Sequence, residues 1–176
     1  LSPDGASVVM VSDSGGPPQL WLRPINAVDA KLLAGTEGAA YPFWSPDSSR
    51  IGFFAQGKLK IVPAQGGIVT TVCDANNGRG GTWNRDGVIL FAPEAFGGLY
   101  RVAETGGTPV AVTTEPVANE GDRFPEFLPD GSHFLFLRFS DKDAGLYASD
   151  LSGATRARIL PDVTNGIYMP GRTRDG

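Results

Sequence analysis

The sequence predicts an all-β protein built from four-stranded antiparallel sheets, and three features of the chain support this fold class. A turn phrase, "SPDG" in its first copy, recurs at intervals of 43, 39, 44 and 45 residues, with aspartates at Asp4, Asp47, Asp86, Asp130 and Asp175. Short runs rich in β-branched and aromatic residues follow the first four copies. The 24 glycines and 14 prolines interrupt these runs before a helix of about ten residues could form. A repeat of about 40–45 residues with four short strands is typical of a β-propeller blade.

The turn phrase predicts a hairpin between the first two strands of each repeat. Proline at its second position presets φ at about −65°, and aspartate suits the third position of a type I turn. Glycine at the fourth position accepts a positive φ. The strand before the turn ends in an aromatic residue in three copies, at Trp44, Trp83 and Phe127. We expect these three residues at equivalent positions, at the ends of the innermost strands.

The strand after the turn is apolar on both faces in two repeats, "RIGFFA" at 50–55 and "VILFA" at 88–92. A strand with one face in water would alternate, so this pattern predicts sheets stacked against one another. A third strand begins at a leucine in each repeat: Leu20, Leu59, Leu99 and Leu146. A fourth short run completes each repeat, at 31–34, 68–73, 109–113 and 157–160.

These runs predict one partial propeller domain over 1–176, with four blades at 1–34 plus 166–169, 41–73, 81–113 and 124–160. The first repeat lacks the strand before its turn, whereas Gly166–Met169 is a surplus strand, so sixteen strands are expected. We expect Gly166–Met169 to pair with Ala6–Ser12, in the same chain or in a partner chain. The chain is then a four-bladed ring, an open partial propeller, or half of a homodimer that closes an eight-bladed ring.

The pattern W-S-P-D-x-x-x-I-x-F, which begins at Trp44 and is followed by L-x-x-V and G-G, resembles TolB-like, WD-repeat-like propeller blades. The resemblance covers nearly the whole chain. The segments "NGRGGTWNRDGVILFAP" and "FLPDGSHFLFL" more narrowly resemble the C-terminal propellers of bacterial serine/threonine kinases. Because those propellers follow a kinase domain and a membrane span, this resemblance implies an extracytoplasmic or periplasmic location and a sensor role.

Composition and charge exclude several classes of partner. The net charge is −4 and the isoelectric point about 4.9, which disfavours nucleic acids and anionic membrane surfaces. No apolar run approaches the roughly 18 residues of a membrane span, so direct membrane contact is not expected. The chain opens inside a turn phrase, without the regions of a signal peptide, which suggests a piece cut from a longer protein.

Catalytic and metal-binding patterns are weak, so we expect no enzyme activity, cofactor or metal. The chain has one cysteine, Cys73, expected to be a buried strand residue, and one histidine, His133, expected at a strand edge. No G-x-S-x-G motif is present. Residues 141–145 resemble the start of a calcium loop, but Ser152 stands where a glutamate would be needed. Residues 76–81 are glycine-rich but lack the lysine of a phosphate loop.

Loops that join one blade to the next gather at one mouth of a propeller, and here they are polar and glycine-rich. The candidate binding residues on these loops are Glu37, Asn77, Arg79, Asn119, Glu120, Asp122, Arg123 and Asn165. Arg79 and Arg123 stand at comparable positions in consecutive repeats, and two guanidiniums at one mouth would suit an acidic or polar segment. Alternatively, Arg123 pairs locally with Glu120 or Asp122 and only fixes its loop.

The sequence therefore favours a non-enzymatic binding or scaffold module that recognises a protein or peptide, as the sensor part of a larger signalling protein. The alternative is an accessory or gating propeller of an enzyme such as a serine peptidase. A third reading is a fragment with no independent function. Sequence beyond either end of the chain would distinguish a kinase and a membrane span from a hydrolase nucleophile motif.

Overall fold

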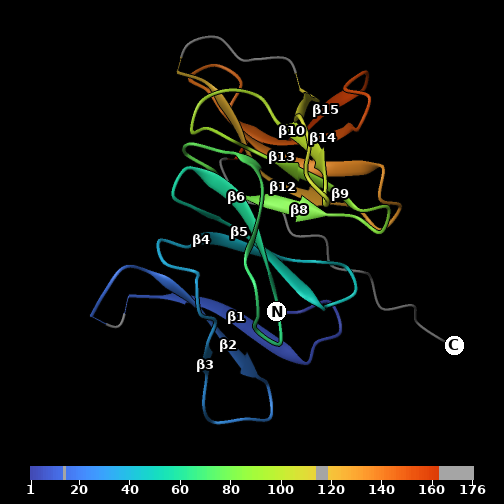
Figure 1. The fold of residues 1–176 in the computed structure, drawn as a ribbon. Coiled ribbons are helices and arrows are strands. Elements are labelled where there is room, and N and C mark those ends of the chain that lie inside the picture. Colours follow the sequence, from blue (N-terminus) through green and yellow to red (C-terminus); the bar gives the residue numbers. More distant parts are fainter. Residues whose placement is uncertain (14, 114–118, 163–176) are drawn as a thin grey trace, which may run out of the picture.

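The structure is a computed structural model that describes residues 1–13, 15–113 and 119–162. Four antiparallel sheets follow one another in chain order from one end of the molecule to the other (Figure 1). The described residues contain no helix, and so none long and apolar enough to cross a membrane. The all-β prediction is confirmed, and the four sheets do not close into a ring.

Sheets 1 and 2 cover the first half of the chain. Sheet 1 contains β1 (Ser7–Ser12), β2 (Gln19–Pro24) and β3 (Lys31–Leu32). Sheet 2 contains β4 (Ala40–Trp44), β5 (Arg50–Ala55), β6 (Lys58–Pro63) and β7 (Thr70–Asp74). In both sheets, consecutive strands are neighbours, as in an up-and-down meander.

Sheets 3 and 4 repeat the same order. Sheet 3 contains β8 (Gly81–Trp83), β9 (Val88–Phe91), β10 (Tyr100–Ala103) and β11 (Val110–Ala111). Sheet 4 contains β12 (Gly121–Phe127), β13 (His133–Phe139), β14 (Gly145–Asp150) and β15 (Arg156–Leu160). The described residues thus form fifteen strands. The expected sixteenth strand at Gly166–Met169, and its pairing with Ala6–Ser12, lie outside the described residues.

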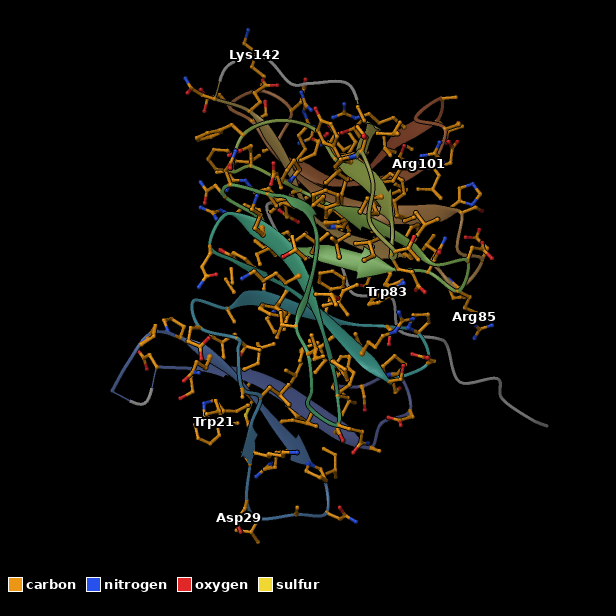
Figure 2. The ribbon with its side chains drawn as sticks, in the orientation of Figure 1. Trp21, Asp29, Trp83, Arg85, Arg101 and Lys142 are labelled. Carbon is orange, nitrogen blue, oxygen red and sulfur yellow. The ribbon has the colours of Figure 1, made fainter. Side chains whose placement is uncertain are left out.

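The first strands of sheets 2, 3 and 4 lie side by side. β4 contacts β8, β8 contacts β12, and β4 also contacts β1. These strands are therefore the inner edges of the sheets, close to a common axis. Trp44, Trp83 and Phe127 each end such an inner strand, as predicted, and Figure 2 shows Trp83 at the end of β8.

The turn phrase forms the predicted turn in all four described copies, and in the last three it joins the first two strands of a sheet as a hairpin. The fourth residue donates its backbone N–H to the carbonyl of the first and has a positive φ, at Gly5 (73°), Ser48 (61°), Gly87 (74°) and Gly131 (70°). In three copies the aspartate closes the turn from its side chain, whereas Asn84 takes this role in the copy that contains Asp86. Asp47 accepts hydrogen bonds from the Ser45 hydroxyl and from the backbone N–H and hydroxyl of Ser49, which lower its pKa to about 2. Asp4, Asp47 and Asp130 are thus structural residues of their turns.

The core lies between consecutive sheets as three apolar clusters. β5 is buried on both faces, because Ile51 and Phe53 pack towards sheet 1 while Phe54 packs towards sheet 3. This is the packing that the two-sided apolar pattern of residues 50–55 predicted.

Each inner strand carries a bulge that the sequence did not reveal. Three residues before the final aromatic residue, φ is positive at Tyr41 (49°), Gly80 (91°) and Phe124 (51°). Register shifts of β4 between Ala40 and Phe43, and of β12 between Arg123 and Glu126, mark the extra residue. The bulges set the direction of the side chains that form the candidate site.

Candidate functional site

The three bulges pack against one another along the axis. The backbone N–H of Phe124 donates to the carbonyl of Arg79 at 2.9 Å, and the rings of Tyr41 and Phe124 lie 5.6 Å apart. Gly80 leaves room for this approach, since a Cβ there would lie 2.8 Å from the Phe124 ring and 3.0 Å from its Cα. The bulges therefore join β4, β8 and β12 at one end of their inner edges.

The two predicted arginines are held at this end by backbone carbonyls and aromatic rings. Arg79 donates to the carbonyl of Gly78 at 3.0 Å, and its guanidinium lies 5.7 Å from the ring centre of Tyr41. Arg123 Nε donates to the carbonyl of Ala95 at 2.7 Å. Its guanidinium lies between two rings, 4.7 Å from that of Phe139 and 5.3 Å from that of Phe96.

The arginines are close enough for their charges to interact. Burial, and after it the positive charge of Arg79, lowers the pKa of Arg123. No carboxylate of the described residues forms an ion pair with either arginine. The aromatic residues beside them are partly open to solvent, with Phe96 50% exposed. We call this surface the arginine–aromatic rim: Tyr41, Arg79, Phe96, Arg123, Phe124 and Phe139.

The local pairing of Arg123 with Glu120 or Asp122 is wrong. Arg138 binds both carboxylates instead, through Nη2 to Glu120 at 2.5 Å and through Nη1 to Asp122 at 3.1 Å. The reason is the register of β12 and β13, which places Asp122 directly opposite Arg138. Asp122 and Arg123 lie in β12 rather than in a loop, and Asp122 is fully buried, so it does not reach a partner.

Of the remaining candidate residues, only Asn77 is bound to an arginine of the pair, since Arg79 Nη1 donates to its carbonyl at 3.4 Å within the part of the chain that the structure describes. Glu37 is exposed and accepts a hydrogen bond from the Gln19 side chain at 2.9 Å. Asn77 and Asn119 are exposed, and Asn119 has a φ of 70°. Asn165 lies outside the described residues. Sequence reasoning missed the aromatic half of the rim, although Tyr41 and Phe124 precede an aromatic strand end by three residues each.

A groove of about 770 Å³ runs along the inner strands. One end opens at the rim, where Tyr41, Gly80 and Phe124 line it, and the other end reaches the turn phrases at Asn84 and Gly131. Its middle is lined by the aromatic and proline residues of β4, β8 and β12. An extended peptide or a side chain of a partner could enter this groove from the rim.

The other chemical candidates behave as structural residues. Burial chiefly raises the pKa of the Cys73 thiol to about 11, so the reactive thiolate is scarce at neutral pH. His133 begins β13, and its Nδ1 lies 2.6 Å from Asp130. Within the described ranges, no group of three histidine, cysteine or acidic residues is placed to hold a metal ion.

No protein-family model matches the chain, and no curated protein matches it significantly. Among solved structures, it is similar to a TolB-like structure from Agrobacterium tumefaciens, with a TM-score of 0.77 and 19% identity over 90% of this chain and 62% of that one. It is also similar to TolB from Acinetobacter baumannii, with a TM-score of 0.74 and 15% identity over 91% of this chain and 42% of that one.

A third solved structure, the nidogen/laminin complex, contains a chain that matches with a TM-score of 0.71 and 11% identity. The match covers 86% of this chain and 60% of that one. The four sheets thus have the fold of TolB-like β-propeller blades. The chain spans between 42% and 62% of the length of these solved chains.

Proposed function

We propose that the chain is a non-enzymatic binding module that recognises an acidic segment of a protein partner at the arginine–aromatic rim. The observation that carries the proposal is the pair Arg79 and Arg123, which lack carboxylate partners among the described residues and are held against partly exposed rings. The planar guanidinium binds carboxylates through paired hydrogen bonds. Arginine and aromatic residues also supply most of the binding energy in protein interfaces.

The fold comparisons are compatible with this role. One similar solved chain comes from a complex of two proteins, nidogen and laminin. At 11% identity this likeness concerns the fold, so the support for an acidic ligand comes from the rim itself.

The proposal is tested by selecting peptides from a random display library on the wild-type protein and measuring their affinities by calorimetry. We expect acidic peptides, and we expect the double variant R79A/R123A to weaken their binding by about 2 kcal/mol or more. The matched control is R23A/R101A, which removes two exposed arginines elsewhere and should leave the affinity unchanged. Equal losses in both variants would indicate a long-range charge effect, and selection of peptides without acidic residues would refute the proposal.

We further propose that the module works within a larger protein, as the sensor part of a signalling protein. The support is its length, since it corresponds to between 42% and 62% of the similar solved chains, together with the kinase-linked pattern in its sequence. An accessory role in an enzyme such as a serine peptidase is the alternative. The adjoining reading frame decides between a kinase with a membrane span and a hydrolase nucleophile motif.

We also propose that two copies close an eight-bladed ring. Sheet 1 carries an apolar row on the face opposite its contact with sheet 2, formed by Met10, Trp21 and Leu32 in cross-strand register. Met10 is 38% and Leu32 37% exposed, and Figure 2 shows Trp21 on this end sheet. Light scattering should give twice the chain mass of 18.5 kDa, whereas a monomer mass at micromolar concentration would refute the dimer.

A further inference from the structure

The axial groove contains a carboxylate that has no partner among the described residues. This carboxylate is Glu126, which lies on β12, lines the groove and is half-buried. Within residues 1–13, 15–113 and 119–162, no hydrogen bond or ion pair joins its side chain to another group. The other carboxylates close to β12, those of Glu120 and Asp122, are both held by Arg138. Unlike Glu120 and Asp122, Glu126 therefore has no structural role that the described residues account for.

Its surroundings disfavour a bare negative charge. Burial raises the pKa of Glu126, and no cation of the described residues offsets this effect. Arg85 is the one basic side chain among the described residues that line the groove, and it is exposed and belongs to the turn at the far end. A cation supplied from outside would regain the electrostatic energy that burial removes.

The walls near Glu126 also suit a cation. Tyr41, Trp44, Phe124 and Phe127 line the groove with it, and aromatic faces attract ammonium and guanidinium groups. The long apolar stem of lysine or arginine would meet the prolines Pro42 and Pro125 of the same lining. An extended basic side chain thus fits both the charge and the apolar walls.

We propose that the groove binds a lysine or arginine side chain of the partner segment, paired with Glu126. This inference rests on the proposed function for its claim that the ligand is a peptide. Arg123 and Glu126 lie on the same strand, β12, on either side of its bulge. The ligand is therefore an extended segment with an acidic residue for the rim and a basic residue close to it in sequence.

The test uses the full chain, isotopically labelled, and two probes: the peptide acetyl-Ala-Lys-Ala-amide and its uncharged counterpart with norleucine in place of lysine. In NMR titrations at pH 7, we expect the lysine peptide to shift the resonances of Glu126, Trp44 and Gly81, and to bind at least about tenfold more tightly than the norleucine peptide. Glu126→Gln should remove this preference. R79A/R123A should leave it intact, which separates a failure of the groove site from a failure of the rim.

A second measurement needs no ligand. Since burial raises the folded-state pKa of Glu126, the fold loses stability as the pH rises from the ordinary glutamate pKa through the raised one, and the full cost is present above both. Glu126→Gln should raise the unfolding temperature at pH 7 and leave it nearly unchanged at pH 4. Glu37→Gln, an exposed control, should change neither. Equal affinity for both peptides, or a lower unfolding temperature of Glu126→Gln at pH 7, would overturn the proposal.

Discussion

Trp44 and Trp83 end equivalent strands, yet their indole N–H groups meet different environments. Trp83 Nε1 donates to the Glu104 carboxylate at 3.0 Å, whereas Trp44 Nε1 is buried without a partner. The residue equivalent to Glu104 in sheet 2 is Ala64, since both donate their backbone N–H to the corresponding turn of their hairpin at 2.8 Å. The methyl group of Ala64 offers no acceptor to the indole.

The two tryptophans also differ in the residue that the preceding sheet places beside them. Arg50, the first residue of β5, donates to Glu104 at 2.9 Å and lies 4.6 Å from the ring centre of Trp83. The corresponding residue at the boundary between sheets 1 and 2 is Ser7, which is too short for these contacts. Sheets 2 and 3 are thus joined by a polar triad of Arg50, Trp83 and Glu104, while sheets 1 and 2 carry only its tryptophan.

The boundary between sheets 3 and 4 shows another solution. Phe127, Leu151 and Val88 occupy the three positions there, and none of these side chains has a polar atom that requires a partner. Neither a complete polar triad nor a fully apolar set leaves one of these three side chains with a buried, unpaired donor. A buried unpaired donor costs about 1–3 kcal/mol, which makes the boundary between sheets 1 and 2 the incomplete case.

The largest expected effect comes from Glu104→Ala. It removes the acceptor of Trp83 and the ion-pair partner of Arg50, and we expect a loss of about 2 kcal/mol in the free energy of unfolding. Urea denaturation measures it, with Glu37→Ala as the exposed control. A loss below that of the control would show that the triad contributes nothing.

A smaller effect distinguishes the two tryptophans directly. Trp83→Phe breaks a satisfied hydrogen bond and should cost about 1.5 kcal/mol, whereas Trp44→Phe removes an unpaired donor together with some apolar area and should cost less than about 0.5 kcal/mol. Both are measured by the same urea unfolding. Equal costs would mean that the indole N–H of Trp44 is hydrogen-bonded in solution.

The smallest effect is expected for Arg50→Ser, which copies Ser7 into the second boundary. The Arg50–Glu104 pair is partly exposed, with side-chain exposures of 35% and 28%, so its loss should cost about 0.5–1 kcal/mol. Raising the salt concentration to 1 M should reduce this cost, because exposed ion pairs are screened. A cost that salt does not change would assign the role of Arg50 to packing on Trp83.

The sequence predicted the parts of the molecule that repeat with simple turn chemistry. The turn phrase and the strand-end aromatic residues Trp44, Trp83 and Phe127 follow from local pattern, and Arg79 and Arg123 were placed together by the same repeat. The bulges at Tyr41 and Phe124 could not be predicted, because a positive φ at a bulky residue leaves no compositional signal.

The ion-pair partners of the charged residues also could not be predicted from residues close in sequence. Arg138 takes Glu120 and Asp122 because of the strand register, and sequence proximity favoured Arg123 instead. The unpaired state of Glu126 depends on three inner strands from different repeats, so it becomes visible only in three dimensions.

The bulge in each inner strand also divides that strand into two independent segments. An extra residue between Arg123 and Glu126 resets the alternation of side chains, so the residues before it need not follow the pattern that packs Phe127 into the core. The residues at positions 79 and 123 can therefore be substituted without changing the packing of the aromatic strand ends, which lie four residues later. Substitutions confined to the rim would therefore change the ligand of this scaffold and leave its core packing intact.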